Sequence, residues 1–257
     1  MKKFLFSIFS TMLIFSLVLT AQSGAMDVEA AKLYNKGNKE VKSGNYAGAI
    51  KSYEEALKIS KDYRIFYQLG TAYKKQRKYA NAESALNESL KLNPEFATAY
   101  NSLGTTYYAW GKYDKAVESF QKFHDNVSSK KMKKVAAKYI GLAYTKLGES
   151  KFKDRDYTAA EDYFKNAVKY YKYDAAYLKL ADIYVETGKF NEAIKAADNA
   201  INNRSSKSKV PKGAPYFFKG MAFKGLKNVE KAKENFKIAK TDRTYRDRSK
   251  YELKYMN

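Results

Sequence analysis

The sequence predicts an all-α fold in which helical hairpins stack one after another, and three observations lead to this prediction. Bulky and small residues recur at spacings of three and four, the period of a helix with one buried face. The same pattern returns along the chain in steps of about 34 residues. Only three prolines and thirteen glycines occur among 257 residues, and no stretch alternates apolar and polar residues as a half-buried strand does.

The clearest copy of the pattern spans Asn93 to Asn126. One apolar stripe precedes Gly111 and another follows it, which predicts two helices joined by a tight turn at this glycine. The stripes consist of Tyr100, Leu103 and Tyr107, then Tyr113, Ala116, Phe120 and Phe123. Gly104 and Ala116 are small where the two helices approach each other. One hairpin cannot bury both stripes, so it needs stacked neighbours.

Six such units are present. We call the small residue of the first helix that corresponds to Gly104 the anchor of its unit, and the six anchors are Gly37, Gly70, Gly104, Gly148, Ala181 and Gly220. Residues 30–126 hold the first three units and residues 141–240 hold the last three. The anchor spacing rises from 34 to 44 after the third unit. This indicates an insertion at 127–140 that lengthens the next helix by about two turns and divides the array into three plus three units.

Two further segments depart from the repeat. Residues 202–215 hold two of the three prolines together with serines, lysines and an arginine, which is typical of a loop. This basic loop is either a binding finger or a solvated linker. Residues 241–257 lose the pattern but keep several tyrosines, and we expect them to form a helix that caps the last hairpin.

Residues 1–25 have the three regions of a secretory signal: Lys2 and Lys3, an apolar run from Phe4 to Thr20, and small residues ending at Ala25. The run is short for a membrane-spanning helix and is interrupted by serines. We therefore expect cleavage after Ala25 and export to the periplasm, the cell envelope or the medium. The alternative is an uncleaved leader that anchors the protein to a membrane.

The six units resemble tetratricopeptide repeats, each of which is about 34 residues of helix, turn and helix. The resemblance covers roughly Ala30 to Lys240. It is clearest in the second and third units, where nearly all of the leucine–glycine pair, the tyrosine, the alanine, the aromatic residue or leucine, and the proline appear, as in Leu69, Gly70, Tyr73, Ala82 and Pro94. It implies a right-handed superhelix whose first helices line a concave groove, and in this family such grooves hold extended peptides or partner helices.

The resemblance also places four positions of each unit in the groove. They are the third and second residues before the anchor, the first residue after it, and the fourth residue after it. In the first three units these are Tyr34, Asn35, Asn38, Tyr67, Gln68, Thr71, Lys74, Asn101, Ser102, Thr105 and Tyr108, with Val41 as the fourth position of the first unit. Amides and hydroxyls suit hydrogen bonds to an extended backbone, and tyrosines add apolar area. The alternative is an ordinary solvated helix face.

One groove of the family, that of cytosolic co-chaperones, clamps the acidic carboxy-terminus of heat-shock chaperones with lysines, asparagines and an arginine. Asn38 fits this pattern. Tyr34, Thr71, Asn101 and Thr105 stand where the other clamp residues would be. The resemblance therefore does not extend to this ligand.

The charge of the chain favours anionic partners in general. Forty-nine basic and 27 acidic residues give a formal net charge of +22, which raises affinity for any polyanion. Only seven of the basic residues are arginines, however. Lysine lacks the planar guanidinium group with which arginine forms paired hydrogen bonds to nucleic-acid bases. The alternative is a lysine-rich composition without a functional role.

Catalysis and metal binding are not expected. The absence of cysteine excludes disulfides, thiol catalysis and thiolate metal sites, and His124 is the only histidine. No phosphate-binding glycine loop or serine nucleophile motif occurs. We predict a non-enzymatic, exported scaffold without cofactor or metal that binds a peptide or partner protein. The alternative is a protein that binds nucleic acid or acidic cell-wall polymer.

Overall fold

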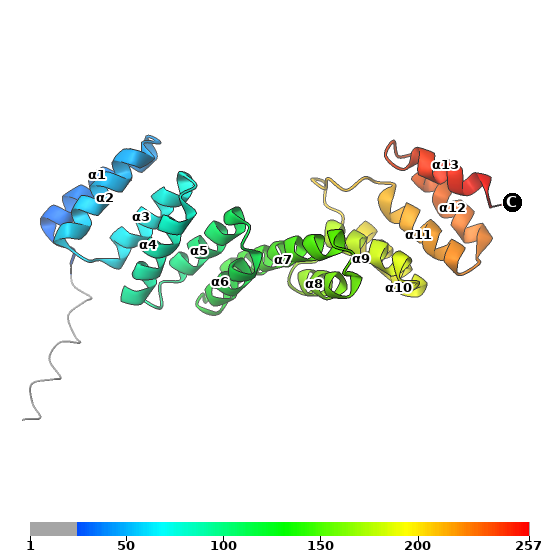
Figure 1. The fold of residues 1–257 in the computed structure, drawn as a ribbon, viewed down its shortest axis with the longest axis horizontal. Helices are drawn as coiled ribbons and strands as arrows, with labels where there is room; N and C mark the ends of the chain where they lie inside the picture. The colour runs from blue at the N-terminus through cyan, green and yellow to red at the C-terminus, as the bar shows by residue number, and fades with distance from the viewer. Residues whose placement is uncertain (1–24, 257) are drawn as a thin grey trace, which may run out of the picture.

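The computed structural model describes residues 25–256, which form thirteen helices and no strand (Figure 1). The helices are α1 (Val28–Lys42), α2 (Tyr46–Ile59), α3 (Tyr63–Lys75), α4 (Tyr79–Leu92), α5 (Ala97–Trp110), α6 (Tyr113–Asp125), α7 (Lys130–Lys153), α8 (Tyr157–Tyr170), α9 (Asp174–Glu186), α10 (Phe190–Asn202), α11 (Ala214–Gly225), α12 (Val229–Ala239) and α13 (Arg246–Lys254). The predicted signal segment, residues 1–25, lies outside the described residues except for Ala25. Within the described part of the chain, no helix combines the length and the apolar character that crossing a membrane requires.

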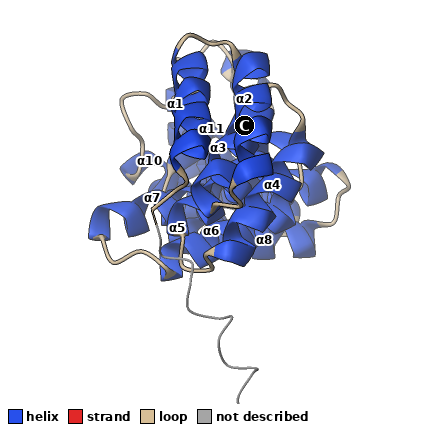
Figure 2. Cartoon of the chain, turned by 90° about the vertical axis from the view of Figure 1, so that its left-hand side faces the viewer, coloured by secondary structure: helices blue, strands red, loops and turns tan. Residues whose placement is uncertain are grey.

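Consecutive helices pair into six hairpins that follow one another along an elongated, curved body, and α13 closes the array. The first helices of the central hairpins lie on the inner side of the curve and the second helices on the outer side (Figure 1). Figure 2 looks along the array and shows α1 and α2 side by side at the near end. The predicted all-α stack of hairpins is confirmed.

Each hairpin turns at the same place, the seventh residue after its anchor. That residue has a positive φ between 58° and 83° in all six turns: Gly44, Arg77, Gly111, Arg155, Gly188 and Lys227. A left-handed residue ends the first helix and starts the reversal of the chain. Glycine adopts this conformation without strain, whereas arginine and lysine do so at an energetic cost.

The two helices of a hairpin meet where the anchor glycine faces the side chain sixteen residues later. A Cβ atom built on Gly104 would lie 2.6 Å from the ring of Phe120, and one on Gly37 would lie 2.5 Å from Tyr53. The close approach expected at Gly104 is therefore present. Its main partner is Phe120, one helical turn beyond Ala116.

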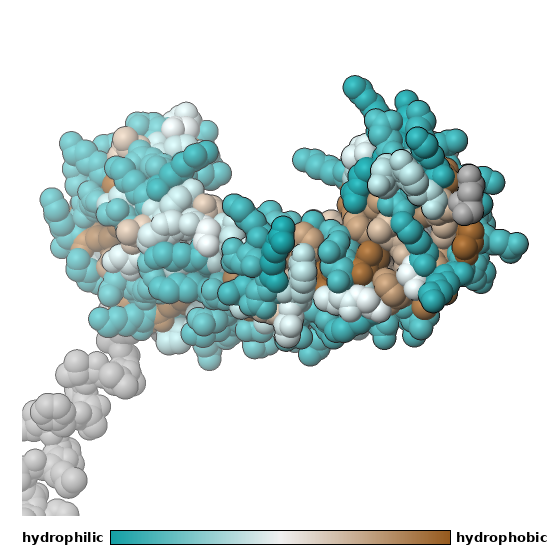
Figure 3. Space-filling view, turned by 45° about the vertical axis from the view of Figure 1, so that its right-hand side comes forward, coloured by the Kyte–Doolittle hydropathy of each residue, from teal (hydrophilic) through white to brown (hydrophobic). Residues whose placement is uncertain are grey.

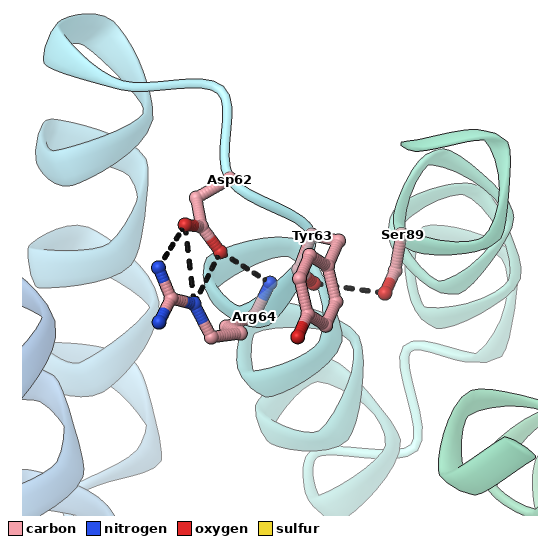
Figure 4. Close-up of polar contacts among 4 residues, drawn as sticks. All are labelled: Asp62, Tyr63, Arg64 and Ser89. Atoms are coloured by element: carbon pink, nitrogen blue, oxygen red, sulfur yellow. Dashed lines mark hydrogen bonds and ion pairs between the residues drawn. The ribbon is translucent and has the colours of Figure 1, made fainter. Parts of the chain in front are cut away.

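Polar contacts join the start of α3 to the rest of its hairpin (Figure 4). Asp62 caps α3 by accepting a hydrogen bond from the Arg64 backbone N–H at 2.7 Å, and the Arg64 guanidinium donates to the same carboxylate. Burial opposes ionisation of Asp62, but the bonds and charge of Arg64 outweigh it and lower its pKa. Ser89 on α4 is fully buried and donates to the Tyr63 carbonyl at 2.8 Å.

The expected division of the array at residues 127–140 is not seen. The insertion belongs to α7, which has 24 residues against 14 in its partner α8. The Tyr139 ring of α7 stacks on Phe120 of α6 at a centroid distance of 5.1 Å, and Ile140 joins the same buried cluster. Packing is continuous here because α7 is long enough to contact both α6 and α8.

Polar contacts connect the basic loop between α10 and α11 to the start of α9. The Arg204 guanidinium lies 3.8 Å from the buried Asp174 carboxylate and donates to the Val210 carbonyl at 2.6 Å. The Ser208 hydroxyl also donates to Asp174. Arg204 is therefore bound within the protein, whereas Lys207, Lys209 and Lys212 are exposed.

The last helix, α13, covers the end of the array. Tyr245, just before it, lies 5.1 Å from the Phe217 ring of α11, and the Arg248 guanidinium lies 4.3 Å from the same ring. Ser249 and Met256 are buried. The apolar face of the sixth hairpin is thus shielded from water, as a terminal repeat requires.

Candidate functional site

The candidate site is the inner face of the curve, where the molecule is hollowed between its raised ends (Figure 3). The residues selected from the sequence lie on three helices of this region, α1, α3 and α5. Contacts bring those of α3 and α5 together, whereas those of α1 mainly contact α2.

The centre of the site is a polar link between α3 and α5. Lys74 Nζ on α3 donates a hydrogen bond to Thr105 Oγ1 on α5 at 2.9 Å, and that hydroxyl donates to the Ser102 carbonyl at 3.0 Å. Burial lowers the pKa of Lys74, and the charge of Lys75 adds to the effect. No ion pair of the described residues includes Lys74. A largely buried cation therefore has only a hydroxyl as its partner.

Two further polar atoms lie about one helical turn earlier on the same helices. Thr71 Oγ1 on α3 and Asn101 Oδ1 on α5 are buried and have no hydrogen-bond partner among the described residues. A buried polar atom without a partner loses roughly 1–3 kcal/mol relative to water. Both residues are half-buried as a whole, so their side chains lie at the surface although these two atoms are covered.

Aromatic side chains border this polar centre. The Tyr67 ring meets Phe96 edge to face at a centroid distance of 5.1 Å, and Tyr108 meets Tyr113 in the same way at 5.4 Å. Tyr67 and Tyr108 are both half-buried, and burial raises the pKa of Tyr108. They offer apolar surface with a polar tip.

The residues on α1 are partly engaged within their own hairpin. Asn38 Oδ1 accepts a hydrogen bond of 2.7 Å from the hydroxyl of the buried Tyr53, and the Tyr34 ring lies 6.0 Å from Tyr53. Asn35 is exposed. On α3 and α5, Gln68 and Tyr108 are half-buried. Only 5% of Ser102 is exposed, so this serine offers little surface to a ligand.

The inner face continues onto α7 and α9 with a different chemistry. Lys146 and Glu149 on α7 form an ion pair of 2.6 Å, and Lys179 lies 3.8 Å from Asp182 on α9. Burial raises the pKa of Asp182 against the opposing charges of Lys179 and Arg248. This part of the face is therefore charged, whereas the part formed by α3 and α5 is mainly neutral.

A tetratricopeptide repeat model matches residues 67–128 and 145–208, and a second model described as a TPR repeat matches residues 37–77. Together they cover more than half of the chain. The chain belongs to the tetratricopeptide repeat family.

Curated relatives of this family match only part of their own length. The chain is 30% identical over 98 residues to small glutamine-rich tetratricopeptide repeat-containing protein 2 of Saccharomyces cerevisiae, covering 38% of this chain and 28% of the relative. It is 29% identical over 142 residues to human DnaJ homolog subfamily C member 7, covering 51% and 28%. The wheat Hsp70-Hsp90 organizing protein is 27% identical over 111 residues, covering 39% and 19%. The chain thus spans less than a third of these relatives.

A solved structure with the same fold is MamA from Desulfovibrio magneticus. It superposes with a TM-score of 0.50 at 19% identity and covers 69% of this chain and 94% of the MamA chain. At this identity the similarity supports the shared arrangement of repeats.

The repeat register also explains which residues the sequence analysis missed. The second residue before the anchor and the first residue after it are Lys146 and Glu149 in the fourth unit, and Lys179 and Asp182 in the fifth unit. In the sixth unit the third and second residues before the anchor are Phe217 and Phe218, which Tyr245 covers. The open part of the inner face therefore runs from α1 to α9.

No group of three histidine, aspartate or glutamate side chains within residues 25–256 is arranged to hold a metal ion. His124 is near the end of α6, where it contacts the neighbouring Asp125 at 3.0 Å.

Proposed function

We propose that this protein is a non-catalytic scaffold that binds an extended peptide segment of a partner protein on the inner face formed by α3 and α5. The observation that carries the proposal is the group of Lys74, Thr71 and Asn101, whose polar atoms are buried with few or no partners. An extended peptide supplies both hydrogen-bond donors and acceptors, which matches this unsatisfied set.

The chemistry of the three groups indicates how such a peptide is held. Lys74 donates to a peptide carbonyl or carboxylate. The Asn101 side chain turns so that Oδ1, which is covered in the unbound structure, accepts from a peptide N–H. The Tyr67 and Tyr108 rings border these groups and bind apolar side chains of the peptide. The name of the wheat relative, an organizing protein for Hsp70 and Hsp90, agrees with a role in holding other proteins.

The experiment uses the chain that begins at Met26 and a peptide selected from a random library of extended peptides for binding to this chain. We expect the double variant Lys74→Met and Asn101→Ala to lose about 2–4 kcal/mol of binding free energy in calorimetry. The matched control is Lys58→Met with Asn81→Ala, which changes the same residue types at exposed positions on α2 and α4. Equal affinities of the two double variants would refute binding at this face.

Salt dependence separates this function from polyanion binding. The affinity for a peptide bound at the α3 and α5 face should change little between low and high salt. Binding of a nucleic acid by the lysine excess would weaken steeply, with a slope of about −0.9 for each phosphate neutralised. A steep slope together with an unaffected Lys74→Met and Asn101→Ala variant would favour the polyanion alternative.

We further propose that the protein is exported and works in the periplasm, the cell envelope or the medium. The support is the three-part leader at residues 1–25. The mass of the native protein should correspond to a chain that starts at Met26. An intact chain starting at Met1 and recovered with membranes would instead indicate an anchor.

A further inference from the structure

The long helix α7 extends beyond the end of its partner α8. A Cβ atom on Gly141 would lie 2.7 Å from Tyr171 Cβ, so the end of α8 and its following residue meet α7 at this position. The preceding turns of α7 pass the end of α8. A hollow of 650 Å³ lies there, and it is lined by Lys130, Lys131, Lys134, Lys138, Tyr170 and Tyr171.

The lining of this lysine hollow is positively charged without a balancing acidic side chain in the part of the chain that the structure describes. No acidic residue lines it, and no aspartate or glutamate occurs between Asp125 and Glu149. None of its four lysines takes part in an ion pair of the described residues. Like charges held close together repel one another, and a bound anion relieves this repulsion.

The floor of the lysine hollow is apolar. Val135 and Ala137 lie between the lysines, and Tyr170 and Tyr171 close the side toward α8. Lys138 Nζ lies 5.9 Å from the centre of the Tyr171 ring. The hollow thus combines cations at its rim with space for an apolar side chain, within the volume range of ordinary binding pockets.

We propose that the lysine hollow binds an acidic segment of a partner protein, whose carboxylates pair with the lysines while one apolar side chain enters the hollow. Recognition of bases usually relies on arginine, and the hollow has none. A membrane surface is flat, whereas this site is recessed between two helices. The hollow is separate from the face of α3 and α5 and does not depend on peptide binding there.

The experiment measures binding of a short fluorescent peptide in which glutamates flank a central leucine–phenylalanine pair. One control peptide has glutamine in place of glutamate, and the other has serine in place of the apolar pair. We expect each control peptide to bind at least about tenfold more weakly at physiological salt, because it lacks one of the two kinds of contact. Equal binding of the serine peptide would show that the hollow receives no apolar side chain and would overturn the proposal.

Matched variants locate the binding. Lys134→Glu with Lys138→Glu should weaken binding of the glutamate peptide about tenfold or more, whereas Lys58→Glu with Lys61→Glu should change it less than about twofold. All four lysines are exposed and the two pairs change the net charge equally, and circular dichroism checks that both variants are folded. The Lys74→Met and Asn101→Ala variant should keep the affinity of the parent for this peptide, which separates failure here from failure at the α3 and α5 face.

Three outcomes would contradict the proposal. The first is no binding of the glutamate peptide, and the second is an equal loss in both lysine-pair variants, which would mean diffuse attraction. In the third, a thymidine oligonucleotide or a phosphatidylglycerol vesicle binds more tightly than the peptide and is lost in the Lys134→Glu and Lys138→Glu variant. That result would assign the hollow to nucleic acid or to membrane lipid.

Discussion

Asp182 shows how a single side chain of the inner face is held at the expense of stability. It lies on α9 among helices of the inner side, and burial raises its pKa despite the nearby Lys179 and Arg248. A carboxylate that ionises less readily in the folded state than in the unfolded chain destabilises the fold at neutral pH. A residue of this kind is compatible with a role in binding.

We expect Asp182→Asn to be more stable than the parent at neutral pH. The folded-state pKa of Asp182 lies above its unfolded value, so its contribution to stability is complete below the unfolded pKa and falls as pH rises through the folded one. Thermal unfolding of the two proteins should therefore coincide near pH 3 and separate by about pH 7. An equal difference at both pH values would mean that ionisation is not the cause.

At the scale of the element, the hairpin turn has one geometry and two kinds of residue. Gly111 and Arg77 occupy the same position in consecutive units, and both have a positive φ. The backbone conformation is therefore set by the packing of the two helices. The side chain at this position only changes the cost of adopting it.

Substitution at the turn should accordingly act in opposite directions in the two units. Arg77→Gly removes the left-handed strain and should stabilise the protein by about 1 kcal/mol, less the entropy that glycine adds to the unfolded chain. Gly111→Ala introduces that strain and should destabilise by about 1 kcal/mol. Urea denaturation measures both changes. Equal signs for the two would contradict a shared turn geometry.

The seam of each hairpin depends on the absence of a side chain at the anchor. Gly104→Ala places a methyl group 2.6 Å from the present position of the Phe120 ring and should destabilise by roughly 1–3 kcal/mol. Phe120→Leu makes room for that methyl group. The leucine substitution should therefore cost less stability in the Gly104→Ala background than in the parent, and additive effects in this double-mutant cycle would contradict the contact.

At the scale of the whole molecule, the packing passes through the insertion without a break. Phe120 of α6, Tyr139 of α7 and the buried residues beside them form one cluster across the junction. In a repeat array, stability is the sum of the units and of the interfaces between neighbours. A packed junction between α6 and α7 should therefore couple the two halves.

The single tryptophan tests this coupling. Trp110 ends α5 and reports on the first half of the array, whereas far-ultraviolet circular dichroism reports on all helices. We expect the two signals to follow the same thermal transition in the parent. Tyr139→Ala removes the ring that stacks on Phe120 and should separate them. Separate transitions in the parent itself would indicate an array divided at the insertion.

Much of this protein was determined by its sequence alone, because helical periodicity and repeat spacing are local properties. The anchors Gly37, Gly70 and Gly104 predicted the hairpins, and the residues sixteen places later now face them. The same register predicts Lys74 and Thr105 on the inner face, and the hydrogen bond between them joins the first helices of two consecutive units. Each of these inferences needed only residues within one or two consecutive units.

The tertiary structure decided what depends on contacts between units. Sequence spacing could not show that Ser102 is buried, that Thr71 Oγ1 lacks a partner, or that Tyr245 covers the sixth unit. It also could not show that the added turns of α7 join α6 while leaving a lysine hollow past the end of α8. The physical reason is that burial and pairing depend on where neighbouring hairpins place their atoms, and this placement is not encoded in the period of any one helix.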